Sequence, residues 1–200
     1  MELLGAPASP FVRMARMVAW EAGLKDELAF TVVTTTALET DARLAAVNPL
    51  GKIPALIRPS GAALYDSRVI CRFLNDQASA GLYPDARLWE VLTLEATAHG
   101  MAEAAVLMVY ERRLRPEVEQ SEAWIAAQWE KVTRALDAVE ARWMSHLGGP
   151  LDASHIALAA TLGYLDFRHG ARDWRLGRPA LAAWFQRAAE WEAFVATAPA

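Results

Sequence analysis

The spacing of hydrophobic and polar residues divides the chain into two parts. Up to about residue 76, short apolar runs alternate with segments whose apolar residues recur every three or four positions. From residue 87 onward the helical spacing continues with few interruptions. A period of two indicates strands and a period of 3.6 indicates helices. The pattern therefore predicts a small α/β domain followed by a larger all-helical domain.

The first domain is predicted to have the element order β-α-β-α-β-β-α, which is a thioredoxin-like order. Its first helix begins after Ser9-Pro10, because serine is a common N-cap and proline suits the first helical position. Pro59-Ser60-Gly61 predicts a hairpin turn. The expected elements occupy residues 1–4, 10–22, 28–36, 38–47, 55–58 and 62–65, and a last helix follows residues 66 and 67.

The second domain is predicted to contain only helices. They are expected over Leu88–Leu114, Glu117–Leu147, Asp152–Arg168 and Pro179–Ala196, the last as one helix or two. The segment 152–168 is mostly apolar on all sides, so it is expected to lie at the centre. The predicted organisation is a thioredoxin-like domain at 1–76, a linker at 77–86 and an all-helical domain at 87–200.

Composition and charge exclude several classes of protein. Apolar residues make up 54% and charged residues 22% of the chain, which is too apolar for a disordered protein. The net charge of −4 is spread along the chain, which argues against a nucleic-acid partner. No apolar run has the length of a membrane helix, and no secretory signal follows Met1. The single cysteine, Cys71, fits a reducing compartment, so a cytoplasmic location is expected.

Three places in the first domain carry residues suited to binding. Ser9 lies at a helix N-terminus, where unpaired N–H groups and the helix dipole favour an anion. Pro54 begins a strand without donating to its ladder, so the backbone of Ile53 is available to an extended, peptide-like ligand. Asp66-Ser67 begins another helix. The Asp66 carboxylate suits an ammonium group of a ligand, and the Ser67 hydroxyl and N–H suit a ligand carboxylate.

Each of these places also has a structural interpretation, as an N-cap or as the start of a strand. Taken together, they describe a ligand with a thiolate or other anion at one end and an amino-acid head group at the other. An extended backbone would join the two ends. That is a description of glutathione.

Four motifs, in this order, resemble the glutathione S-transferase family in its bacterial and tau/omega-like branches. The motifs are Ser9-Pro10-Phe11-Val12-Arg13, Asn48-Pro49-Leu50-Gly51-Lys52-Ile53-Pro54, Tyr65-Asp66-Ser67-Arg68-Val69-Ile70 and Leu162-Gly163-Tyr164-Leu165-Asp166-Phe167-Arg168. The resemblance covers the whole chain. It implies a glutathione-binding N-terminal domain, an all-helical C-terminal domain, a homodimer and a role in detoxification.

The resemblance implies that Ser9 is the catalytic residue. Its hydroxyl would donate a hydrogen bond to the glutathione sulfur and favour the thiolate. The thiolate is the nucleophile, and a hydrogen-bond donor at a helix N-terminus lowers the pKa of a thiol. The implied activity is a transferase reaction in which this thiolate attacks a small electrophile.

The resemblance also implies which residues bind glutathione. Ile53, presented by a cis-Pro54, would pair with the cysteinyl backbone. Asp66 and Ser67 would hold the γ-glutamyl group, and Lys52 would approach the glycyl carboxylate.

A pocket for the second substrate is predicted from one face of the long helix at 88–114 together with the first helix. Its predicted residues are Phe11, Met101, Met108, Tyr110 and Arg112. The same residues could equally belong to the core or to a dimer contact.

Two other functions stay open. The chain could be a non-catalytic glutathione-binding scaffold or stress-response protein. It could also be a glutathione-dependent isomerase or dehalogenase of the same fold.

The remaining chemical side chains predict no further site. Cys71 is expected to be a small buried residue rather than a nucleophile. The four histidines show no metal-ligand spacing with acids or cysteines, so no metal is predicted. His155 stands where related core helices carry the acid of a capping box begun at residue 152. A histidine there is expected to lose the reciprocal bond and to weaken this helix start.

Overall fold

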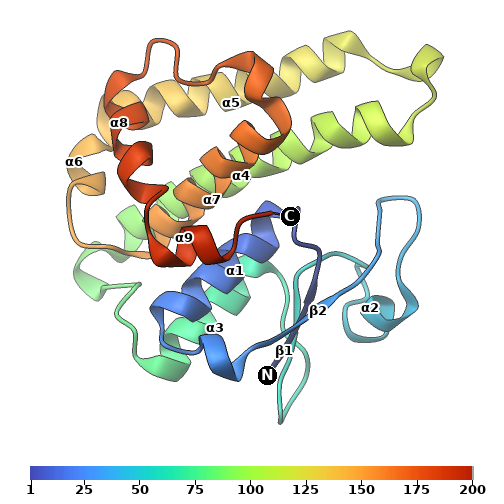
Figure 1. The fold of residues 1–200 in the computed structure, drawn as a ribbon, viewed down its shortest axis with the longest axis vertical. Coiled ribbons are helices and arrows are strands. Elements are labelled where there is room, and N and C mark those ends of the chain that lie inside the picture. The colour runs from blue at the N-terminus through green and yellow to red at the C-terminus, as the bar shows by residue number, and fades with distance from the viewer. Residues whose placement is uncertain (200) are drawn as a thin grey trace. The chain divides into compact units, whose positions relative to one another are not determined.

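The computed structural model describes residues 1–199, which form two compact units (Figure 1). The first unit comprises Met1–Ala86 together with the segment from Glu192 onward, and the second comprises Arg87–Trp191. The sequence placed the segment from Glu192 in the helical domain, whereas here it groups with the first unit.

A three-stranded mixed sheet is the framework of the first unit, with the strand order β2-β1-β3. β1 (Glu2–Gly5) and β2 (Ala29–Val32) are parallel and are connected through α1 (Pro10–Glu21). β3 (Ala55–Ile57) is antiparallel to β1, and α3 (Ser67–Ala78) follows it. The predicted thioredoxin-like α/β domain is thus confirmed.

The second strand of the predicted hairpin is much shorter than expected. Residues 62–65 contribute a single antiparallel bridge, between Leu56 and Leu64. The reason lies in the turn, where the Arg58 guanidinium donates to the Ala62 carbonyl through Nε at 3.0 Å and Nη2 at 2.8 Å. A side chain therefore occupies the acceptor that a longer ladder would have used.

The predicted helix at 38–47 begins later, as α2 (Ala42–Val47). The Asp41 carboxylate accepts hydrogen bonds from the backbone N–H groups of Arg43 and Leu44, at 2.8 and 3.2 Å, and so forms the N-cap. The hydroxyl of Thr36 accepts from the backbone N–H of Glu39 and holds the preceding segment in a turn. Local side-chain bonds thus compete with helix formation before Asp41.

α1 and α3 pack together, and their fully buried apolar side chains cover the sheet. The core of the unit includes Leu3, Leu4, Val12, Leu56 and Leu74, each with an exposed fraction of 0%. Burial of this kind contributes about 1.5–3 kcal/mol for each large aliphatic side chain. The apolar alternation seen in the sequence therefore marks the inner faces of these elements.

The C-terminal segment is held on α1 by a buried arginine. Arg13 donates from Nη2 to the carbonyl of Phe194 at 2.6 Å and from Nε to the Thr197 hydroxyl at 3.4 Å. Its guanidinium lies 3.7 Å from the centre of the Phe194 ring. Burial, together with the nearby charge of Arg16, lowers the pKa of Arg13 to about 10. Arg13 therefore explains why α9 (Glu192–Ala196) groups with the first unit.

The second unit is all-helical, as predicted. Its helices are α4 (Leu88–Leu114), α5 (Glu122–Arg142), α6 (Met144–Leu147), α7 (Ala153–His169) and α8 (Pro179–Ala188). α7 is buried from residue 153 to residue 165 and packs on α4. No helix within residues 1–199 has the length and apolar character needed to span a bilayer.

The predicted helix at 117–147 is divided into three pieces. A 3₁₀ turn covers Glu117–Glu119, and α5 then begins after Ser121, whose hydroxyl accepts from the backbone N–H of Trp124 at 3.1 Å. The Glu111 carboxylate accepts from the backbone N–H of Ser121, which fixes this new helix start. Trp143 separates α5 from α6.

As expected, His155 does not form the reciprocal bond to the backbone N–H of Asp152, and the expected weakening of the α7 start stays a prediction. Asp152 is the N-cap, and its Oδ1 accepts from the backbone N–H of Ser154 at 3.1 Å. His155 turns its Nδ1 to the same oxygen at 2.9 Å, so it bonds the capping side chain and not the capping backbone. Burial raises the pKa of the Asp152 carboxyl, but the bonds from His155 and Ser154 outweigh it, and the pKa lies below its usual value.

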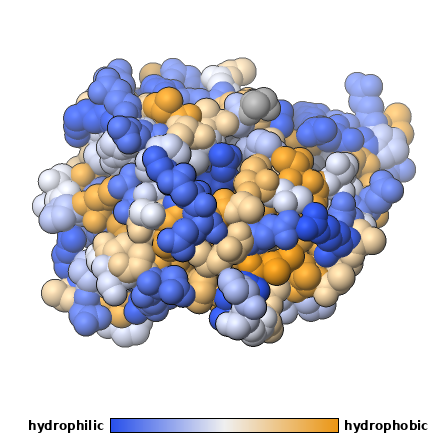
Figure 2. Space-filling model, turned by 60° about the horizontal axis from the view of Figure 1, so that its bottom comes forward, coloured by the Kyte–Doolittle hydropathy of each residue, from blue (hydrophilic) through white to orange (hydrophobic). Residues whose placement is uncertain are grey.

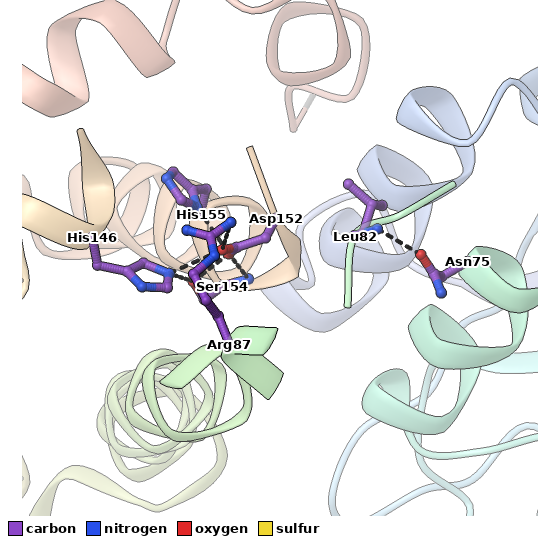
Figure 3. A network of polar contacts seen from close by, with 7 residues as sticks. All are labelled: Asn75, Leu82, Arg87, His146, Asp152, Ser154 and His155. Carbon is purple, nitrogen blue, oxygen red and sulfur yellow. Dashed lines mark hydrogen bonds and ion pairs between the residues drawn. The ribbon is translucent and has the colours of Figure 1, made fainter. Parts of the chain in front are cut away.

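We expect Asn75→Ala to destabilise the first unit by about 1–3 kcal/mol, because it leaves a buried N–H group without an acceptor. Asn75 Oδ1 accepts from the backbone N–H of Leu82 at 2.7 Å, and both residues are buried (Figure 3). Urea unfolding monitored by circular dichroism measures the change. Gln77→Ala, at an exposed position of the same helix, is the control and should change the free energy of unfolding by less than about 0.5 kcal/mol. Equal effects of the two substitutions would contradict this role of Asn75.

Candidate functional site

The register of the sheet brings the three predicted binding places to one end. Leu4, near the end of β1, pairs with Ala55 at the start of β3, so the loop leading to α1 lies beside the turn that precedes β3. Leu56 pairs with Leu64 in antiparallel fashion. The chain after Leu64 therefore runs back toward Pro54 and reaches Asp66 at the same end of the sheet.

Ser9 is the N-cap of α1, and its hydroxyl can still donate a hydrogen bond. Its Oγ accepts from the backbone N–H of Val12 at 3.3 Å. Among residues 1–199 this hydroxyl has no acceptor for its own hydrogen. Ser9 is partly exposed, and the first turn of α1 holds no acidic residue. The hydroxyl can therefore donate to an anion placed at this helix end.

The turn before β3 is organised by Asn48, which the sequence placed in the turn-forming part of the motif at 48–54 without a binding role. Asn48 is buried, and its amide donates from Nδ2 to the Lys52 carbonyl at 2.7 Å while Oδ1 accepts from the backbone N–H of Leu50 at 3.0 Å. Gly51 has φ = +62° in this turn, and a Cβ there would lie 2.7 Å from the Thr40 side chain. The Asn-Pro-x-Gly pattern was the available signal, because such residues hydrogen-bond their own backbone in turns.

Ile53 presents the unpaired backbone that the sequence predicted. Neither its N–H nor its C=O has a hydrogen-bond partner within the described residues 1–199. The Ile53–Pro54 peptide bond is cis, as the resemblance implied, and Pro54 is buried. The Ile53 side chain packs against the cluster of Leu4, Val33, Leu44 and Ala55. The side chain thus anchors the residue while its backbone remains available to an extended ligand.

Asp66 and Ser67 begin α3 with different surroundings. Asp66 is the N-cap: its Oδ1 accepts from the backbone N–H of Arg68 at 2.9 Å, and its Oδ2 lies 3.0 Å from the Arg68 guanidinium. This carboxylate is about half exposed, so its contact with Arg68 can be shared with a ligand ammonium group. Ser67 is 2% exposed and lies at the first position of the helix.

Lys52 is exposed beside Ile53. Within residues 1–199 its ammonium group forms no ion pair with a carboxylate. A cation in this position suits an anionic end of a ligand, consistent with the predicted place of the glycyl carboxylate.

The residues predicted for the second-substrate pocket lie in both units. Phe11 belongs to the first unit and is partly exposed. In the second unit Met101 and Met108 are buried, with exposed fractions of 1% and 2%. Arg112 is engaged by Gln120 at 2.9 Å and by Glu122 at 2.6 Å. The pocket stays a prediction.

Comparisons with family models and with known proteins all match the same family. Residues 8–77 match the family model described as glutathione S-transferase, N-terminal domain, and residues 122–187 match the one described as glutathione S-transferase, C-terminal domain. An uncharacterised GST-like protein of Escherichia coli, YibF, is 32% identical over 100% of this chain and 98% of its own length.

Two solved structures extend the similarity to three dimensions. A glutathione transferase family member from Pseudomonas fluorescens Pf-5, with bound glutathione, has a TM-score of 0.97 and 39% identity, covering 100% of this chain and 98% of that one. A glutathione S-transferase from Methylobacillus flagellatus KT, with glutathione bound, has a TM-score of 0.85 and 34% identity, covering 100% and 99%.

The similarity thus extends over the entire length, and the four motifs occur in the expected order. It does not assign the chain to the tau/omega-like branch. The protein belongs to the glutathione S-transferase family.

Proposed function

We propose that this protein is a glutathione transferase that activates the thiol of glutathione for attack on a small electrophile. The observation that carries the proposal is the Ser9 hydroxyl, which caps α1 and keeps its own hydrogen available at a helix end without acidic residues. The glutathione bound in the related bacterial structures supports the choice of ligand.

The chemistry is an ionisation followed by a displacement or an addition. The thiol of glutathione loses its proton to solvent, and the thiolate is stabilised by the Ser9 hydroxyl and by the N-terminus of α1. The sulfur then forms a bond to the electrophilic carbon. In a displacement the leaving group departs with the bonding electrons, and in an addition the electrons of the broken π bond move to the substrate, which then takes a proton from solvent. No side chain of the protein needs to act as a general base in this scheme.

Binding uses the three places at one end of the sheet. The cysteinyl backbone of glutathione pairs with the unpaired N–H and C=O of Ile53. Its γ-glutamyl group lies at the start of α3, where Ser67 and the helix N-terminus receive the carboxylate and Asp66 receives the ammonium group. Lys52 lies toward the glycyl carboxylate.

Ser9→Ala is expected to lower kcat/KM with a general aryl halide by about 10- to 100-fold, since a hydrogen bond to a charged group contributes about 1.5–3 kcal/mol. Glutathione affinity, measured by calorimetry, should change little, because the main binding groups lie at Ile53 and α3. Ser60→Ala, an exposed serine of the same unit, is the control and should match the unchanged protein.

Three results would count against this proposal. Unchanged turnover in Ser9→Ala would remove Ser9 from the mechanism. Glutathione binding without turnover on a broad panel of electrophiles would favour the scaffold function, and turnover confined to isomerisation or dehalogenation would favour the third function.

Asp66→Asn is expected to raise the Kd for glutathione by about 2- to 5-fold, since an exposed ion pair contributes about 0.2–1 kcal/mol. Asparagine still caps α3, so the effect reports the lost charge and not a lost helix start. Asp76→Asn is the matched control, because Asp76 is exposed on the same helix and also pairs with an arginine, Arg72, at 3.2 Å. A similar loss in both variants, or a loss that persists in 1 M salt, would contradict a direct role for Asp66.

We also propose that the protein is a homodimer. Both units expose large hydrophobic side chains, including Val69 at 47% and Trp89 at 76%, and Figure 2 shows hydrophobic residues reaching the surface among hydrophilic ones. Light scattering should give about twice the chain mass of 21.9 kDa. A mass equal to that of the single chain at micromolar concentration would refute this assembly.

A further inference from the structure

A buried group of two histidines and one aspartate joins α6 to the start of α7 in the helical unit. Figure 3 shows His146, Asp152 and His155 turned toward one another, with Ser154 and Arg87 beside them. The side chains of Asp152 and His155 have exposed fractions of 0% and 3%, and that of His146 has 10%. None of these residues belongs to the proposed glutathione site.

The three side chains converge on a small space. His155 Nδ1 lies 2.9 Å from Asp152 Oδ1, and His146 Nε2 lies 2.9 Å from Asp152 Oδ2. One ligand atom from each of the three residues lies within 4.8 Å of the others. The nitrogen and oxygen ligands of a tetrahedral zinc ion, at about 2.0–2.2 Å from the metal, lie roughly 3.4 Å from one another. Small rotations of the rings would therefore bring these three atoms to a common ion.

Of the two carboxylate oxygens of Asp152, only Oδ1 receives hydrogen bonds from the described residues. Oδ1 accepts from the Ser154 hydroxyl at 2.6 Å, from the backbone N–H of Ser154 and from His155. Oδ2 is buried and, within residues 1–199, receives no hydrogen bond of acceptable geometry, although His146 Nε2 is 2.9 Å away. His146 Nε2 lies within hydrogen-bond distance of the Ser154 hydroxyl, at 3.2 Å, so Asp152 Oδ2 is the buried ligand oxygen that keeps a position for a cation.

We propose that His146, Asp152 and His155 bind a divalent transition-metal ion, with zinc as the best match. Two imidazole nitrogens and a carboxylate are a ligand set that zinc accepts in proteins, and the borderline character of imidazole disfavours calcium and magnesium. The ion would bind through His146 Nε2, an Asp152 oxygen and His155 Nδ1.

The role of this ion is structural. Asp152 and His155 are buried and His146 is nearly so, and the three ligands come from α6 and from the N-cap and first turn of α7. A shared ion would therefore link two helices across the loop at residues 148–151. The free energy of metal binding then adds to the stability of the folded unit, since the unfolded chain does not hold the three ligands together.

Arg87 is the counter-charge when no ion is bound. Its Nη2 lies 3.7 Å from Asp152 Oδ2, and its side chain is 33% exposed. A guanidinium in this position competes with a metal cation for the same oxygen, and its exposure allows it to turn toward solvent. The alternative to a metal site is a network of hydrogen bonds that only caps α7. In that case Arg87 only neutralises the charge of the Asp152 carboxylate.

The test is titration of the chelator-treated full chain with Zn²⁺ by calorimetry and with Co²⁺ by visible absorption. We expect one ion per chain, d–d bands of low-symmetry Co²⁺, and a higher Tm with Zn²⁺. His146→Gln should weaken Zn²⁺ binding by more than about 100-fold, because loss of even an outer-shell partner typically costs 10- to 100-fold. His169→Gln is the control, as His169 lies on α7 and bonds the Ala105 carbonyl.

Arg87→Ala separates the metal site from a simple cap. For a metal site, this substitution lowers stability without metal but raises Zn²⁺ affinity, since the competing charge is gone. For a network that only caps α7, the substitution lowers stability and added Zn²⁺ does not change the Tm. Absence of stoichiometric Zn²⁺ and Co²⁺ binding, or binding equal in His146→Gln and His169→Gln, would overturn the proposal.

Discussion

The antiparallel pairing of β3 with β1 is the contact on which the candidate glutathione site depends. It places the turn before β3 beside the loop that leads from β1 to α1, and the single bridge at Leu56 returns the chain to the start of α3. Three short segments separated by about forty and twelve residues in the chain thus reach one end of the sheet. A shift of this register by one residue would turn the side chains of β3 to the opposite face of the sheet.

The site is built mainly from groups that the fold leaves unpaired. Ile53 keeps both backbone groups without partners in the described chain, and Ser9 keeps a hydroxyl hydrogen without an acceptor. Unpaired polar groups are costly when buried, but at the edge of a sheet and at helix N-termini they remain open to water or to a ligand. Their rigid support comes from neighbours with no chemistry of their own, such as Asn48 in the turn and the apolar cluster beneath Ile53.

The helical unit contains a helix, α7, whose N-terminal end is buried. α7 has no solvent to receive its first N–H groups, so they need partners within the protein. Asp152 receives them, and its charge is in turn surrounded by His146, His155, Ser154 and Arg87. A buried carboxylate with this many neighbours can serve both as a helix cap and as a metal ligand, and the proposed metal titrations separate the two roles.

The sequence by itself determined the order of elements, because hydrophobic period and capping residues act locally. α4 has the predicted bounds, and α7 begins after the predicted cap. The same local signals identified the motifs of the glutathione S-transferase family. Local side-chain bonds that the hydrophobic period does not show shortened the hairpin at Arg58 and began a new helix at Ser121. A tertiary contact, that of Arg13 with Phe194, bound the C-terminal segment to α1. The contact of Arg13 shows the reason, since its partner lies 181 positions later in the chain and a partner that only the fold brings near has no signature in the periodicity.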